Sequence, residues 1–126
     1  MPLSRTPAQT FDAAVLDAVE HLEAHGLTEL DAVEFAVEDV PDVPPGGVDG
    51  ALQPDVLEDS GVPLARLHRD GLGDVRRPVI VLYRRPLETR AADPDDLVDL
   101  AHEIIIDRLA HLLGRDPDDL DPHVED

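Results

Sequence analysis

The sequence has 126 residues, enough for one compact domain, and its 29 acidic residues against ten basic ones, all arginine, give a net charge of −19. A surface this negative repels phosphate backbones and anionic lipid headgroups, so we expect no binding to nucleic acid or to a membrane surface. The chain contains no cysteine, which excludes disulfides, thiol nucleophiles and thiolate metal sites.

The N-terminal part of the sequence predicts a helix followed by a strand. Thr6 is a suitable N-cap, Pro7 fits the first helical position, and Gln9 three residues after the cap completes a capping box. Apolar residues then recur every three or four positions until Gly26, which provides the stop. In residues 32–40, the apolar residues Val33, Phe35 and Val37 alternate with Glu34, Ala36 and Glu38, which predicts a half-buried strand with a polar second face.

The middle of the chain has no helical or strand period over a long stretch. Residues 40–63 carry five prolines and four glycines, and we predict an irregular loop there. A short strand is compatible with residues 62–67, and Gly71 and Gly73 mark a turn. The apolar run VIVLY at residues 79–83 predicts a strand that is buried on both faces.

The C-terminal part predicts a long helix and a short one. Asp93 is a suitable N-cap for a helix over residues 94–113, with proline first and Gly114 as the stop. The same start signal returns at residues 116–119 and predicts a final turn or short helix within an acidic tail, residues 115–126. We therefore predict a single small α+β domain, residues 1–126, in which two helices cover a short sheet.

Charge is distributed unevenly along the chain. Residues 1–63 hold 14 acidic residues and only one arginine, whereas residues 66–90 hold seven arginines and three acidic residues. The basic segment either docks against the acidic segments of the same chain or forms a solvated face, and the sequence leaves both possibilities open. Likewise, the excess of aspartate and the lack of lysine fit either a haloadapted surface or GC-rich codon usage.

Three segments of the sequence are similar to segments of a known protein family. They are VEFAVEDVP at residues 33–41, VIVLYRRPLE at residues 79–88 and EIIIDRLAHLLG at residues 103–114. In order and spacing they resemble the small zincin-like metallopeptidase family, which is widespread in bacteria, including actinobacteria. This resemblance implies a zincin-like fold whose last helix corresponds to the metal-binding helix. In that family the helix carries HExxHxxG, where two histidines hold zinc and the glutamate is the general base.

Alignment through Gly114 shows that this sequence departs from the family motif. Asp107 stands at the position of the first histidine, Arg108 at the glutamate and His111 at the second histidine. Arg108 cannot accept a proton from bound water, because its guanidinium stays protonated at physiological pH. The resemblance therefore implies no catalytic residue here, and it leaves Asp107 and His111 as candidate metal ligands.

A third ligand is not evident from the motif. The acidic ligand of the family falls on Pro117, although Asp116 and Asp118 flank it. Glu103 lies one further turn back on the side of the two candidate ligands, so the three residues form either a weak cation site or the solvated edge of an amphipathic helix.

Arg108 lies near the middle of the apolar face of this helix, about 20° from Leu97 at about 100° per residue. An unpaired charge at such a position would cost several kcal/mol unless it meets a carboxylate or reaches water. We therefore predict that Arg108 pairs with an acidic residue, which is Glu34 or Glu38 on the first strand or the adjacent Asp107.

Two functions follow from this resemblance. The first is a non-catalytic zincin homologue without a cofactor that binds a peptide or a partner protein, with no contact to nucleic acid or membrane. The alternative is an active metal-dependent peptidase that holds zinc through Asp107, His111 and a nearby carboxylate. Because no apolar run approaches about 18 residues and no charged segment precedes one at the N-terminus, we expect a cytoplasmic protein without a signal peptide.

Overall fold

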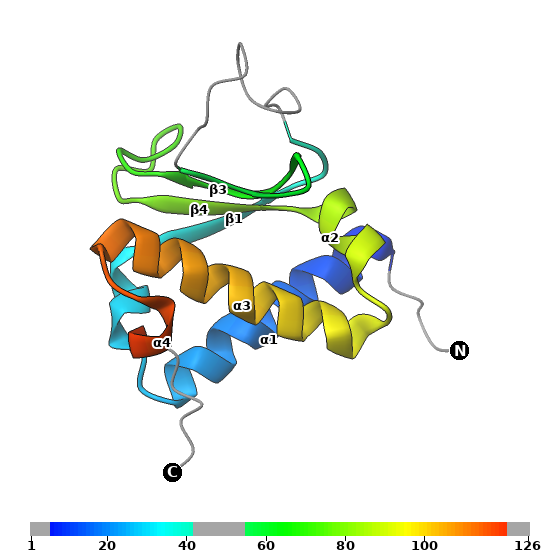
Figure 1. The fold of residues 1–126 in the computed structure, drawn as a ribbon, viewed down its shortest axis with the longest axis horizontal. Helices are drawn as coiled ribbons and strands as arrows, with labels where there is room; N and C mark the ends of the chain where they lie inside the picture. Colours follow the sequence, from blue (N-terminus) through cyan, green and yellow to red (C-terminus); the bar gives the residue numbers. More distant parts are fainter. Residues whose placement is uncertain (1–5, 42–54, 121–126) are drawn as a thin grey trace.

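The computed structural model describes residues 6–41 and 55–120, which form two layers. A four-stranded mixed sheet makes one layer, and helices α1 (Pro7–Ala24) and α3 (Pro94–Leu113) make the other. Figure 1 shows both long helices on the same face of the sheet and packed against each other. The predicted α+β arrangement of two helices covering a short sheet is therefore confirmed.

The ends of the two long helices follow the local sequence signals. The Thr6 hydroxyl accepts a hydrogen bond from Gln9 N–H at 3.1 Å, and the Gln9 side chain accepts one from Thr6 N–H at 2.9 Å. At the start of α3, the Asp93 carboxylate accepts a hydrogen bond from Asp96 N–H at 2.8 Å. Gly114 ends α3 with φ of +68°, in the left-handed region that favours glycine. Both predicted helices are confirmed at both ends.

The sheet has the strand order β1-β4-β3-β2, with β1 and β2 at its edges. These strands are β1 (Glu34–Glu38), β2 (Val56–Asp59), β3 (Val62–His68) and β4 (Val79–Tyr83). β1 pairs with β4 in parallel, while the two other pairs are antiparallel. All five residues of β4 are buried, as predicted for the VIVLY run, and β1 is half-buried along its length.

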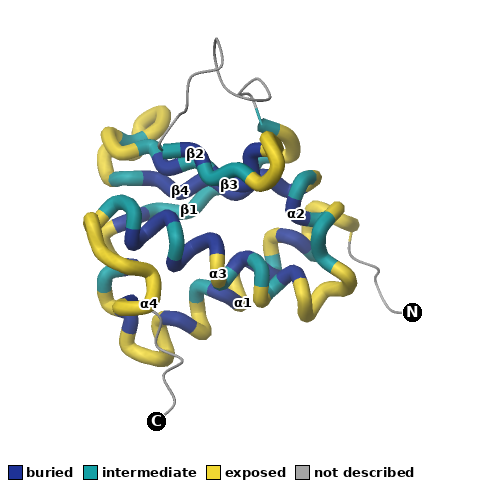
Figure 2. Tube along the Cα trace, viewed as in Figure 1, coloured by how far each residue is buried: buried dark blue, intermediate teal, exposed yellow. Residues whose placement is uncertain are grey.

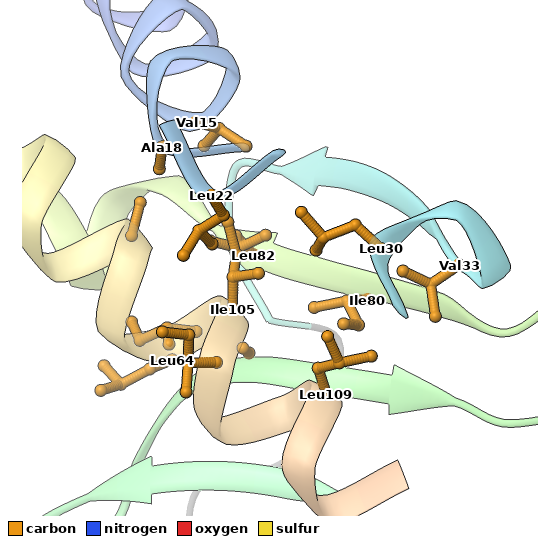
Figure 3. Close-up of a cluster of buried hydrophobic side chains, with 14 of the residues drawn as sticks. Val15, Ala18, Leu22, Leu30, Val33, Leu64, Ile80, Leu82, Ile105 and Leu109 are labelled. Carbon is orange, nitrogen blue, oxygen red and sulfur yellow. The ribbon is translucent and has the colours of Figure 1, made fainter. Parts of the chain in front are cut away.

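The core lies between the inner face of the sheet and the two helices (Figures 2 and 3). Alternate residues of the sheet point into it, and Figure 3 shows Ile80 and Leu82 of β4 close to Ile105 of α3 and Leu22 of α1. Val79, Val81 and Tyr83 alternate with them and form a second, smaller buried cluster on the outer face of the sheet, with Ala36 packed against it.

Three elements occur where the sequence predicted none: β2, a short helix after β4 and a 3₁₀ helix before β1. β2 and β3 form a hairpin whose two loop residues, Ser60 and Gly61, have φ of +53° and +83°. Positive φ at both positions is typical of a type I′ turn. The irregular loop predicted for residues 40–63 is thus wrong for the part that forms β2, while residues 42–54 lie outside the described part of the chain.

The second unpredicted element is the short helix α2 (Arg84–Arg90), which follows β4 directly. Pro86 is tolerated because it occupies the first turn of α2, where a backbone N–H has no helical partner to lose. A 3₁₀ helix, η1 (Thr28–Ala32), precedes β1, and a short helix, α4 (Pro117–Leu120), follows α3.

α4 gives part of the predicted acidic tail a defined place in the fold. The short helix expected from the repeated start signal is present, and its Leu120 is buried in the main core. The tail therefore packs on the domain at least as far as Leu120, and residues 121–126 lie outside the described residues. Within the described ranges, no helix is long and apolar enough to cross a membrane.

Candidate functional site

The C-terminal half of α3 presents the three residues that occupy the motif positions. Arg108 is buried, with 7% of its side chain exposed, and its Nη2 lies 2.8 Å from Asp107 Oδ1. The Arg108 Nε also donates to this oxygen at 3.1 Å. The prediction that Arg108 pairs with an acidic residue is confirmed, and Asp107 is one such partner.

The two other proposed partners of Arg108 lie on a different side of the sheet. The register pairs Glu34 with Val79 and Glu38 with Tyr83, which belong to the outer face of the sheet. α3 packs on the inner face, so these two glutamates point away from it. Glu34 forms an ion pair with Arg77 instead.

His111, one helical turn after Asp107, is held by a residue from the β2–β3 hairpin. Its Nε2 lies 3.1 Å from Asp55 Oδ1, and Arg69 Nε donates to the same carboxylate oxygen at 2.9 Å. Burial by itself raises the pKa of Asp55, but the hydrogen bonds from Arg69 and His111 outweigh it and hold the pKa below its usual value. Asp55 is therefore a carboxylate anion that ties the hairpin to α3.

A pocket of about 200 Å³ opens beside these residues. Its walls come from the last turns of α3 and the start of α4: Asp107, Arg108, Ala110, His111, Arg115 and Pro117. Arg115 is held in place by Glu29 of η1, with 3.2 Å between Nη1 and Oε2. The pocket thus combines two arginines and a histidine with one carboxylate.

These residues do not fit a zinc site of the family type. Such a site needs three protein ligands and an open position. Within the described residues, no group of three histidine, aspartate or glutamate side chains could hold a metal ion. Asp116 accepts a hydrogen bond from Asp118 N–H at 2.9 Å at the start of α4, and Glu103 is exposed to solvent.

Asp55 and Arg69 are the site residues that the sequence did not reveal. Asp55 falls in the segment predicted to be an irregular loop, and nothing in its neighbourhood links it to a histidine 56 residues away. The Ser-Gly pair between the two short apolar runs was the available signal for the hairpin. It would have placed Asp55 and Arg69 near each other, but not near His111.

The arginines of residues 66–90 show whether the basic segment docks on the acidic part of the chain or forms a solvated face. Four of them form ion pairs with acidic residues of residues 34–59, so the basic segment docks against the acidic part of its own chain. These pairs are Arg69–Asp55, Arg77–Glu34, Arg84–Asp39 and Arg90–Asp59.

The chain belongs to the zincin-like metallopeptidase family, because the model of that family matches residues 30–125. The match covers the whole sheet, α3 and α4, and it includes the segment with Asp107, Arg108 and His111. A comparison with curated proteins gives no match for this chain.

Proposed function

We propose that this zincin-family protein binds a peptide or a partner protein without hydrolysing it. The observation that carries this proposal is the ion pair between Arg108 and Asp107, at the positions where the family has a general base and a zinc ligand. A permanent cation at 2.8 Å from a candidate ligand oxygen competes with a metal ion for that oxygen and repels the ion itself.

The second candidate ligand is engaged as well. His111 Nε2 faces the Asp55 carboxylate, and Asp55 is in turn fixed by Arg69. A metal ion at His111 would have to displace this contact and still lack a third ligand among the described residues. The site is thus built as a network of charged hydrogen bonds, which favours a binding role over hydrolysis.

Edge strand β2 supplies the means of binding. It lies at the end of the sheet, and Asp55 directly before it contacts α3 at His111. An extended peptide can add to an edge strand through main-chain hydrogen bonds, which require no metal. We place the peptide along β2, with its end next to the pocket lined by Arg108 and Arg115.

Metal analysis and a protease assay test the loss of catalysis. Protein purified without chelators should contain no stoichiometric zinc and should not cleave a quenched casein substrate, even with zinc added. The missing general base alone should lower the rate by about 10² to 10⁴. One tightly held zinc per chain, lost in Asp107→Ala and in His111→Ala, would establish the active metal-dependent peptidase instead.

Restoring the family motif tests the same idea in the opposite direction. The double variant Asp107→His with Arg108→Glu recreates HExxH on an otherwise unchanged helix, and we expect it to gain zinc affinity in competition with a chromogenic chelator. Each single variant serves as a matched control and should gain less, since each leaves one non-family residue in the motif.

The binding role is tested with peptides of unfolded casein carrying a fluorescent label. Binding should raise the polarisation of the label, and hydrogen exchange should slow at residues 56–59 of β2. The intact peptides should be recovered afterwards. Absence of binding, or protection confined to other elements, would contradict a peptide site at this edge.

A further inference from the structure

A second groove lies at the opposite edge of the sheet, between α1 and edge strand β1. It has a volume of about 450 Å³, and its walls are mostly apolar: Val15, Leu16, Val19, Phe35, Ala36 and Val37, together with Asp12. Leu16 is 56% exposed although it is a large apolar side chain. An apolar groove with an exposed leucine at an open sheet edge is typical of a docking site.

The backbone of β1 offers hydrogen-bonding groups to this groove. Glu34 N–H donates to the Pro78 carbonyl at 2.9 Å, so the backbone groups of Glu34 point toward β4. In a parallel pair the direction alternates along the strand, and Phe35 and Val37 therefore point their N–H and C=O groups toward the outer edge. Their side chains face α1, so the same two residues supply both the apolar wall and the open edge.

One face of β1 is apolar and the other carries two glutamates, so a strand that binds there needs a matching pattern of side chains. A strand added beside β1 would turn alternate side chains toward α1, where Leu16 and Val19 offer an apolar surface. The remaining side chains would lie on the outer face, next to Glu38, whereas Glu34 on the same face is already paired with Arg77. Apolar residues fit the first set of positions, and cations fit the second.

The charge of this part of the chain points in the same direction. Residues 6–41, which form α1, η1 and β1, contain nine acidic residues and no arginine or lysine. Two copies of this surface would repel each other, because each chain carries a net charge of −19. The same negative charge attracts a basic partner.

We propose that the groove between α1 and β1 binds an extended segment of a partner protein in which apolar residues alternate with arginine or lysine. The segment adds to the edge of β1, places its apolar side chains on Leu16 and Val19, and places a basic side chain beside Glu38. This site is separate from the peptide site proposed at β2, which lies at the other edge of the sheet.

A capped synthetic heptapeptide of alternating valine and arginine is the probe. In an NMR titration of the full chain, we expect saturable shifts of amide signals in α1 and β1, and weaker binding as NaCl is added. Three matched peptides separate the contributions: one with glutamate for arginine, one with serine for valine, and one methylated on alternate backbone nitrogens. Each should bind at least about tenfold more weakly than the probe.

Variants of the protein test the same contacts. Leu16→Glu should weaken probe binding by about tenfold, because it removes apolar contact area. Leu72→Glu changes an equally large apolar residue, 37% exposed between β3 and β4 and outside the lining of the groove, and should leave the affinity unchanged. Glu38→Gln should weaken binding by less than Leu16→Glu and should reduce its dependence on salt.

Three results would overturn this proposal. The first is a lack of saturable binding, and the second is a set of shifts centred on Asp55 and His111, which would assign the probe to the β2 edge. The third is a dimer in sedimentation that Leu16→Glu dissociates, because the groove would then be occupied by a second copy. None of these results bears on zinc content or casein cleavage, so failure here is distinguishable from failure of the proposed function.

Discussion

Arg108 places a permanent positive charge on the buried side of α3. Asp107 precedes it on the same helix and keeps 39% of its side chain exposed. Their contact at 2.8 Å keeps the buried guanidinium paired. The chemistry of this site therefore depends on the pair rather than on either residue alone.

Substitutions of Arg108 should show this dependence in urea denaturation. Arg108→Glu places two carboxylates side by side on a buried face, and we expect a loss of about 3 kcal/mol in the free energy of unfolding. Arg108→Leu should lose less, because Asp107 keeps 39% of its side chain exposed and stays hydrated. Equal stability of Arg108→Glu and the parent protein would contradict the paired arrangement.

Asp55 should affect how the free energy of unfolding falls at acid pH. Its pKa in the folded protein lies below the value in the unfolded chain, so the unfolded chain binds more protons as the pH falls. The stability from this carboxylate is complete above the unfolded pKa, about 3.9, and is lost as the pH falls through the lower folded value.

Asp55→Asn should therefore flatten the fall in the free energy of unfolding between about pH 5 and pH 2, measured by urea denaturation at each pH. Some slope should remain, because a hydrogen bond from Arg84 also lowers the pKa of Asp39. Asp17→Asn, at an exposed position of α1, is the matched control. An unchanged slope in Asp55→Asn would show that the contact to Arg69 and His111 does not persist in solution.

Local signals define the elements that the sequence located correctly. α1 and α3 carry caps at their starts and glycines after their ends, and each cap depends on residues within four positions of each other. β2 is only four residues long and its one local signal is the Ser-Gly turn that follows it, while α2 has no side-chain cap and contains a proline. Their pairing with neighbouring elements, rather than their own patterns, stabilises them.

Gly114 stabilises the C-terminal end of α3. It ends α3 with φ of +68°, and a Cβ placed there would meet no atom within 4 Å. Gly114→Ala should therefore lower the free energy of unfolding by about 1 kcal/mol through backbone strain alone. Gly114→Asn should lose less in the same thermal or urea unfolding experiment, and a neutral Gly114→Ala would contradict the strained helix end.

Across the whole molecule, acidic residues greatly outnumber basic ones, and the arginines are used to join distant segments. Arg77, Arg84 and Arg90 connect the second half of the sheet and α2 to the acidic residues Glu34, Asp39 and Asp59. Even so, 29 acidic residues face only ten arginines, so most of the repulsion between carboxylates remains uncompensated.

Salt should consequently stabilise the fold. The screening length falls from about 30 Å at 0.01 M to about 3 Å at 1 M ionic strength, so the melting temperature should rise between low salt and 1 M NaCl. Most of the rise should occur below about 0.2 M if screening is the cause. A flat or falling melting temperature in calorimetry would mean that the ion pairs contribute more than the repulsion does.

The sequence by itself determined the helices that carry caps and apolar stripes, the buried strand β4, the α+β class and the family to which the chain belongs. The elements depend on residues that are near each other along the chain, and the family resemblance depends on the order and spacing of three short segments. Only the tertiary structure decided that Asp55 holds His111, that Glu34 meets Arg77, and that the basic segment docks on the acidic one. Such contacts depend on sheet register and helix packing, which bring together residues that are far apart in the sequence.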